Sequence, residues 1–591
     1  MRYSRSGSGK RGIFLIPALF QREGKFVGGL RGAWSPPIIG GRCSALRPPY
    51  DGVSFRGDFY NHFEVMQSGD LKKYAKKTHL PDEPSIRYNL IQSGKANFCM
   101  KSTVVFQTHH LHLDEGEIIP AQVRCAPGEP LEIQPGRHPG ADIDLPEEVH
   151  IALARADPHV HFRESWIPTP EMFEADPWHP AAQTYEDLVV QIQQANRAYD
   201  VRRGSLAALR GGVWLAGAMG NTPWAPVGQE RWRATWAWYQ KQAWIFTHVW
   251  PRLEPGVPPI PGQEEKDFGS TYGGPEASAD QRKEMYLARR GGMLSYHNDR
   301  ERPDESIAAF RQRVRPPDYL LHPLYYDGDT VLAAQREIIA WAREAGLRRL
   351  LTRHIPTGEA LQMVLSERDA SAMELPAEIG LDYLYFNRDM LASRPTRMIN
   401  YRRPALPSAL DQAALIELTR DQARRRDPWT FLGSDHAPHP RQAKAFRPDG
   451  FPGSPGTRIV EHTHQVHAHL VHHAGYTWAD IDWLAAIVPA RYMAQYRAFP
   501  YPVGTMRGGA MANLVVFHPD TPYRADEARL REWLQDAEYH TAYRDEALRG
   551  EVWFTVVHGI VFEAREAIRP LNASPASLPR YFSAGLEGEG F

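Results

Sequence analysis

The sequence predicts an α/β fold whose main part is a (β/α)8 barrel of the TIM type, with a small β module beside it. From Val149 to about residue 500, apolar runs with strand character alternate with helical stretches, as in chains of parallel βα units. Candidate metal ligands stand at the ends of several apolar runs, and the carboxyl ends of barrel strands meet at one mouth. Strand patterns also occur on both sides of this repeat.

The region before the repeat has two parts. Residues 1–100 are rich in Gly, Arg and Ser and show no sustained helical or strand period, so we assign them as an N-terminal extension of unknown role. From Ser102 to Glu132 short alternating runs predict strands with tight turns. Residues 101–150 are therefore predicted to hold the first part of the β module and a linker.

The barrel is predicted over residues 151–500. Helical periodicity is clear from Thr330 to Ala345, where apolar residues recur on one face and charges occupy the other. The apolar runs taken as examples of strands are Val149–Ala154, Gly212–Gly217, Met293–Tyr296 and Trp429–Gly433.

Strand character returns in residues 501–570, which are predicted to complete the β module, before a tail at 571–591. One strand is expected at Ala512–Phe517. Two further runs, Val552–Val557 and Ile560–Glu563, flank His558-Gly559, and this spacing predicts a hairpin. We expect the two β-rich flanks of the barrel to form one sheet module together.

Charge and cysteine content limit the classes of partner. Lys plus Arg total 69 against 70 Asp plus Glu, so no overall field favours nucleic acid or an anionic membrane. The three cysteines, Cys43, Cys99 and Cys125, lack the count and spacing of a disulfide framework, which fits a reducing cytoplasm. The apolar run that ends at Phe20 is followed by no small-residue cleavage pattern, so we expect no secretory signal. We expect a small-molecule substrate and leave a homo-oligomer open.

A histidine pair begins the chemically informative part of the sequence. His159 and His161 stand two apart after an apolar run, so in a strand both imidazoles point to the same side. Such a pair alone is more often packed or solvated than metal-binding. Further candidate ligands, His297, His354 and Asp435, also stand at the ends of predicted strands, and together the five suffice for a hydrolytic metal site.

Several of these segments resemble dihydroorotases, a family of cyclic amidohydrolases. Asp157-Pro-His-Val-His-Phe-Arg-Glu164 is similar to the family's first-strand motif, and Ser434-Asp-His-Ala-Pro-His439 to its last-strand motif. Between them, Gly211–Pro223 resembles the segment ending in Met-Pro-Asn-Thr, with Gly220 in place of the proline. The similarity runs in family order from Asp157 to Pro519 and leaves the first hundred residues unexplained.

The resemblance implies a zinc centre and a substrate site. It implies hydrolysis of dihydroorotate to N-carbamoyl-L-aspartate, reversibly, by metal-activated water, with Asp435 as general base and then general acid. It also implies one or two zinc ions, with carbamylated Lys266 as a bridge when there are two. The implied metal ligands are His159, His161, Lys266, His297, His354 and Asp435, and the implied substrate contacts are Arg163, Asn221, Asn400 and His439.

Alternatives remain at several points. Lys266 follows Gly262-Gln-Glu-Glu rather than an apolar strand, so an ordinary surface lysine is a competing interpretation. The enzyme could be another cyclic amidase, such as an allantoinase or a hydantoinase, or a non-catalytic subunit that supports aspartate transcarbamoylase. The histidines between His462 and His473 are interpreted as packed or solvated, and the tryptophans from Trp214 to Trp250 as core packing.

Overall fold

The computed structural model describes residues 102–176, 184–268, 278–298, 302, 305–394, 401–445, 453–565 and 568–582. The chain divides into two units, Met1–Ile86 and Arg87–Phe591, and all described residues belong to the second. The extension predicted over residues 1–100, together with Cys43 and Cys99, therefore lies outside the described residues.

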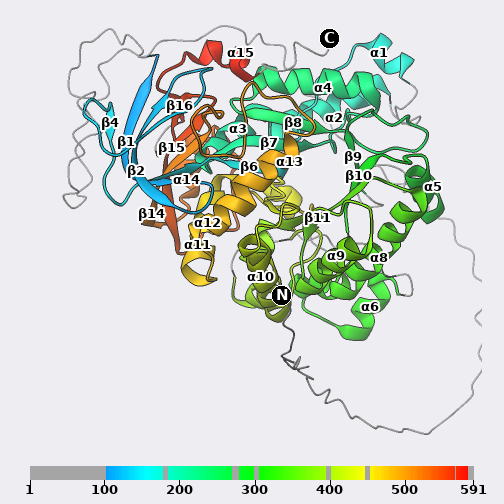
Figure 1. Cartoon of the computed structure of the whole chain (residues 1–591). Helices are drawn as coiled ribbons and strands as arrows, with labels where there is room; N and C mark the ends of the chain where they lie inside the picture. Colours follow the sequence, from blue (N-terminus) through cyan, green and yellow to red (C-terminus); the bar gives the residue numbers. More distant parts are fainter. Residues whose placement is uncertain are drawn as a thin grey trace, which may run out of the picture. The chain divides into compact units, whose positions relative to one another are not determined.

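A nine-stranded sheet combines strands from both flanks of the parallel repeat, as the sequence predicts (Figure 1). Its order is β17-β16-β15-β14-β5-β1-β2-β3, with β4 paired to β1, and the joint is the antiparallel pairing of β14 with β5. Its strands are β1 (Val104–His112), β2 (Ile118–Cys125), β3 (Glu132–Pro135), β4 (Ile143–Asp144), β5 (His150–Leu153), β14 (Leu514–Tyr523), β15 (Leu548–Val557), β16 (Ile560–Glu563) and β17 (Arg569–Pro570).

Eight consecutive parallel strands, β6 to β13, lie in two further sheets, ordered β6-β7-β8 and β9-β10-β11-β12-β13. Isolated parallel bridges, Val160 with His436 and Arg252 with Lys266, connect the two sheets at each side. The strands are β6 (Arg155–Val160), β7 (Val213–Met219), β8 (Phe246–Trp250), β9 (Glu264–Asp267), β10 (Met293–Tyr296), β11 (Arg349–Ile355), β12 (Ala377–Gly380) and β13 (Thr430–Gly433).

The predicted strand Val149–Ala154 does not begin the parallel repeat. Its observed counterpart, β5, pairs with β1 and β14 in the flanking sheet, and β6 begins only at Arg155. A short apolar run has the same appearance in a sheet of either kind, so the residue pattern could not separate them. The chain passes from one sheet to the other through Ala154.

Helices connect most of the parallel strands, although none lies between β8 and β9, where residues 251–263 are all described. The helix predicted at Thr330–Ala345 is α8, which begins with an Asp327 side-chain cap and ends at Gly346 with φ of 65°. The α-helices are α1 (Pro170–Ala175), α2 (Tyr185–Ala198), α3 (Val201–Arg210), α4 (Gly228–Gln242), α5 (Ala279–Leu287), α6 (Ile307–Val314), α7 (Asp318–Tyr325), α8 (Gly328–Ala345), α9 (Gly358–Ala370), α10 (Ala409–Arg424), α11 (Thr463–His473), α12 (Trp478–Asp482), α13 (Val488–Met493), α14 (Glu527–Trp533) and α15 (Leu578–Phe582).

The hairpin predicted around His558-Gly559 is present. Val557 pairs with Ile560, and the two turn residues have φ of 50° and 77°. Positive φ at both central positions is the requirement of the tight turn that matches strand twist, and glycine meets it without steric cost. The turn therefore fixes the register of β15 against β16.

Packing accounts for the tryptophans and most helix histidines, as predicted. Trp214 and Trp250 are buried in the main hydrophobic core, and His464 and His467 on α11 are also buried, as is His462 directly before this helix. His472 and His473, at the end of this helix, are exposed. None of the helices in the described part of the chain has the length and apolar character needed to cross a bilayer.

Candidate metal centre and active site

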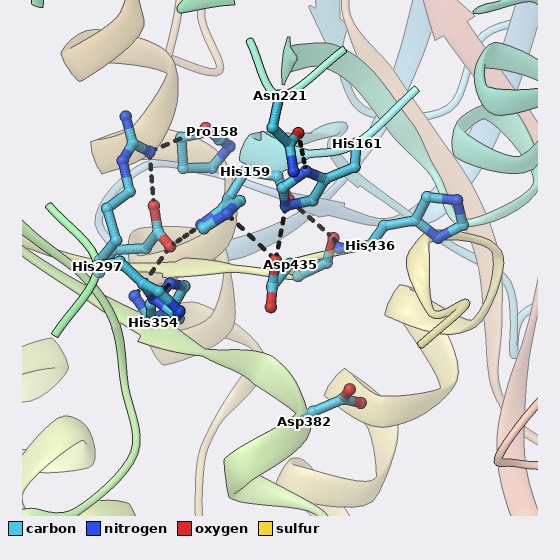
Figure 2. A network of polar contacts seen from close by, with 12 residues as sticks. Pro158, His159, His161, Asn221, His297, His354, Asp382, Asp435 and His436 are labelled. Carbon is cyan, nitrogen blue, oxygen red and sulfur yellow. Dashed lines mark hydrogen bonds and ion pairs between the residues drawn. The ribbon is translucent and has the colours of Figure 1, made fainter. Parts of the chain in front are cut away.

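Two histidines, His159 in β6 and His161 directly after it, meet Asp435, which follows β13, at the carboxyl ends of the two strands (Figure 2). Asp435 Oδ1 lies 3.2 Å from His159 Nε2 and 3.0 Å from His161 Nε2. The ligand atoms of the three side chains all lie within 4.8 Å of one another. Burial alone raises the pKa of Asp435, but the two histidines outweigh it and hold this pKa below its usual value.

The backbone at the strand ends departs from ordinary strand geometry. Arg163, His354 and Asp435 have φ of 63°, 38° and 50°, and they are three of seven non-glycine residues with positive φ in the described ranges. This left-handed region costs L residues free energy and persists only where the surroundings impose it. All three are residues that the sequence singles out for the site.

A second pair of histidines adjoins the first group. His297, which follows β10, presents Nδ1 to His354 Nε2 at 2.8 Å. The His354 ring also lies 5.1 Å, centroid to centroid, from the His159 ring. The four imidazoles predicted as ligands are therefore neighbours, and ring nitrogens face each other in the pair His297 and His354.

Lys266 is buried in β9 and is not a surface lysine, so that competing interpretation is wrong. Lys266 is 1% exposed, and its Nζ has no hydrogen-bond partner among the described residues. Burial, reinforced by the positive charge of Arg353, lowers the pKa of Lys266 to about 7. Burial at this position therefore favours the uncharged amine.

A buried carboxylate, Glu378 on β12, fixes the orientation of His159. Glu378 Oε1 accepts a hydrogen bond from His159 Nδ1 at 2.6 Å, and Glu378 Oε2 accepts one from Arg353 Nη1 at 2.7 Å. Donation from Nδ1 leaves the Nε2 lone pair of a neutral His159 directed at Asp435. Neither Glu378 nor Arg353 was predicted from the sequence as part of the site. The one sequence signal for Glu378 was its position as the single charged residue in the short run Ala-Glu-Ile-Gly, which forms the buried strand β12.

Asp157 was also missed as a structural element of the site. Its Oδ1 accepts the backbone N–H of His159 at 3.1 Å and that of Ser434 at 3.0 Å, which ties the end of β6 to the end of β13. Burial raises the pKa of Asp157 to about 7. The signal lay in the motif itself, where the aspartate directly precedes Pro-His.

Three of the four residues predicted to contact substrate lie within the described ranges, and each takes part in a hydrogen bond at the site. Arg163 Nη2 donates to His439 Nε2 at 2.9 Å, and Asn221 Oδ1 accepts from His161 Nδ1 at 2.6 Å. Asn400 lies outside the described residues. Gly220 stands where the resembled family has proline, and a Cβ there would lie 2.7 Å from the carbonyl oxygen of Trp250. The departure from the family pattern thus matches the local packing.

The donor set fits a zinc site. Imidazole nitrogens with one carboxylate are ligands that Zn²⁺ prefers, and such sites keep a position for water or substrate. The second ring nitrogens of His159 and His161 are each held by an oxygen acceptor, which is typical of metal-binding histidines. The buried Nζ of Lys266, without a hydrogen-bond partner among the described residues, adds a further candidate donor.

Solved structures of cyclic amidohydrolases share this fold. The L-hydantoinase (dihydropyrimidinase) from Arthrobacter aurescens aligns over 80% of this chain and 98% of its own, with a TM-score of 0.63 and 16% identity. The dihydropyrimidinase from Brevibacillus agri aligns over 80% of this chain and 97% of its own, with a TM-score of 0.60 and 15% identity. At these identities the likeness defines the fold.

The sequence relatives are dihydroorotases, as the motifs predict. The dihydroorotase of Pelotomaculum thermopropionicum is 24% identical over 238 residues, which cover 39% of this chain and 49% of the relative. That of Coxiella burnetii is 34% identical over 110 residues, 19% of this chain and 29% of the relative. The matched regions thus span less than half of each relative. No protein-family model matches the chain.

Proposed function

We propose that the protein is a zinc-dependent cyclic amidohydrolase that interconverts dihydroorotate and N-carbamoyl-L-aspartate. The observation that carries the proposal is the convergence of His159, His161 and Asp435 at strand ends, with His297 and His354 beside them. The match to dihydroorotases supports this substrate. We further infer that the two bridges between the parallel sheets close them into one (β/α)8 barrel.

The metal would be held by the imidazoles of His159, His161, His297 and His354, by Asp435 and, if carbamylated, by Lys266. When bound, zinc supplies Lewis acidity and makes water acidic enough to act as a nucleophile near neutral pH. Carbamylation requires an uncharged amine, and the buried Lys266 with its lowered pKa supplies one. Two ions fit this larger donor set.

Asp435 acts on protons. Its Oδ1 faces both His159 and His161, so the carboxylate sits where it can accept the proton of the attacking water and return it to the departing ring nitrogen. Arg163 and His439, held together at 2.9 Å, bind the substrate carboxylate. Because burial lowers the pKa of His439 well below its usual value, the ring stays neutral and leaves the positive charge on Arg163.

The first test is metal content combined with hydrolysis of dihydroorotate followed by ultraviolet absorbance. Zinc in the purified protein and activity that disappears in Asp435→Ala are the expected results. Zinc without turnover of dihydroorotate would overturn the substrate assignment and direct the search to other cyclic amides. A protein that takes up no zinc would contradict the metal-dependent reaction and favour a non-catalytic subunit.

A hydantoinase or dihydropyrimidinase activity is the second candidate, because the solved structures with this fold carry those names. The role of Arg163 distinguishes the two candidate activities. A ring substrate with a carboxylate needs this cation, whereas a neutral hydantoin does not. Arg163→Met should therefore reduce turnover of dihydroorotate and leave turnover of hydantoin unchanged if the protein hydrolyses both. Hydantoin turnover that exceeds dihydroorotate turnover in the unmodified protein would favour the second candidate.

A further inference from the structure

We propose that Glu378, held in place by Arg353, is a positioning residue that orients ligands of both metal positions, so that this one carboxylate couples their occupancy. The inference rests on the proposed metal-dependent function and extends it to residues that contact neither metal nor substrate. Glu378 is fully buried on β12, and both of its oxygens face charged or polar donors.

One oxygen of Glu378 serves two ligand-bearing strands. Oε1 accepts from the His159 ring at 2.6 Å and from the backbone N–H of His354 at 3.1 Å. The first contact sets which nitrogen of His159 is free for a metal. The second holds the strand end where His354 has φ of 38°, a conformation that needs external support. His159 belongs to the first ligand group and His354 to the second.

The carboxylate of Glu378 is itself held by a buried ionic network, through its second oxygen. Arg353, 0% exposed, donates to Glu378 Oε2 and to Glu264 Oε1, each at 2.7 Å, and to the carbonyl oxygen of Pro158 at 3.0 Å. Glu264 also accepts hydrogen bonds from Tyr492 and Tyr496. The network therefore joins β6, β9, β11 and β12, which is four of the eight parallel strands.

Buried charges are unusual among the side chains enclosed by a set of parallel strands. Such interiors are commonly packed with Val, Ile and Leu, and a buried ion pair seldom adds net stability over an apolar pair of equal volume. Lys266 follows Glu264 by two residues on β9, so both side chains point to the same side of that strand. Glu378 thus contacts His159 directly, and Glu264 lies on the same side of β9 as Lys266, so these charges can control the orientation of the proposed ligands.

Glu378→Gln is the informative variant because it keeps the shape and removes the second acceptor. If the amide oxygen faces His159, the amide NH2 must face the donors of Arg353. If the amide NH2 faces His159, it donates to Nδ1 and moves the ring proton to Nε2, the nitrogen that must be free for the metal. Either orientation disturbs His159, while the volume of the core is conserved.

Glu265→Gln is the matched control. Glu265 is the neighbour of Glu264 on β9 and is 2% exposed, but its carboxylate is paired with Arg289, at 2.9 Å from Nε. Both variants therefore lose one buried carboxylate from an ion pair with arginine. Thermal unfolding of the metal-free proteins measures the structural cost of each, and a similar loss in both is the baseline for comparison.

Zinc affinity and stoichiometry of the metal-free proteins, measured by competition with a chelator, give the readout, and the absorption spectrum of the cobalt-substituted proteins reports ligand geometry. We expect two ions in the unmodified protein, both bound about 10- to 100-fold more weakly in Glu378→Gln, with an altered cobalt spectrum. Glu265→Gln should bind both ions as the unmodified protein does.

Three outcomes overturn the inference: equal affinities in the two variants, weakening at one position only, or fewer than two ions in the unmodified protein. Failure of the proposed function looks different. If the unmodified protein binds two ions that Glu378→Gln binds weakly, yet hydrolyses neither dihydroorotate nor hydantoin, the positioning role stands and the proposed reaction fails. If the unmodified protein binds no zinc, both fail.

Discussion

Two histidine-rich regions differ in how their rings are held. On α11, His464 is stacked on Trp478, with ring centroids 5.5 Å apart, and is tilted against Phe517, with centroids 4.5 Å apart. At the strand ends, His159 and His161 are also buried but share one oxygen of Asp435. Within the described ranges, His159, His161 and Asp435 form the one group with metal-site spacing. Convergence on a carboxylate, rather than burial or local density, therefore distinguishes His159 and His161 from the packed His464.

The largest expected effect is at Asp435. In Asp435→Asn the side chain can no longer accept a proton, and proton transfer of this kind contributes about 10²- to 10⁴-fold to rate. We expect kcat for dihydroorotate to fall by about that factor, measured by absorbance at equal bound zinc. A variant that keeps more than a tenth of the rate at full metal content would show that another group moves the proton.

The next effect compares the two histidine regions directly. His159→Ala removes a proposed ligand, so zinc affinity should fall by more than about 100-fold, beyond the range expected for a residue that only supports a ligand. His464→Ala should destabilise the fold and leave zinc affinity unchanged. Chelator competition measures both. Equal loss of zinc in the two variants would contradict the distinction between proposed ligand histidines and packed histidines.

A smaller effect is expected at Arg163. Its guanidinium, held by His439, should form charge-assisted hydrogen bonds to the substrate carboxylate, and losing them weakens binding by about 10- to 100-fold. In Arg163→Met we expect KM for dihydroorotate to rise by that factor with zinc content unchanged. Unchanged KM would remove Arg163 from the substrate site.

The smallest effect concerns stability at acidic pH. Burial lowers the pKa of His464 well below its usual value, with Arg155 and His150 acting in the same direction and Asp482 opposing them. The unfolded chain then binds more protons below about pH 6.5, so the stability contributed by neutral His464 is present above that pH and lost as pH falls.

For one such histidine the loss is about 1.4 kcal/mol per pH unit below that point. His464→Phe cannot be protonated, so its melting temperature should fall less steeply between about pH 7.5 and about pH 5.5 than that of the unmodified protein. Thermal unfolding of the metal-free proteins at a series of pH values tests this. Parallel curves would show that other groups dominate acid unfolding.

The motifs predicted which residues meet at the strand ends, while the residues that support them were beyond sequence reasoning. The convergence of His159, His161 and Asp435 could be predicted because spacing and motif fix these residues locally. Glu378 carries no such signal, since a lone carboxylate in a short strand has meaning only once Arg353 and His159 lie beside it. Pairing between distant strands is a property of the fold.

β9 shows why a charged run can be buried. Each acidic side chain of Glu264–Asp267 has a basic partner, Arg353 for Glu264, Arg289 for Glu265 and Arg282 for Asp267. From the sequence a surface position for Lys266 remained an alternative, because none of these arginines is nearby along the chain. Burial of Lys266 became visible only in the structure.

The pairing of β5 with β14 has a consequence for biosynthesis. His112 and Asp482, which are hydrogen-bonded beside this joint, lie 370 residues apart, so at about 5–20 residues per second roughly 20–70 s separate their emergence from the ribosome. Until β14 is made, one edge of β5 offers unpaired backbone groups to other chains. The flanking sheet can close only late in translation, which makes chaperone protection most valuable before the last strands appear.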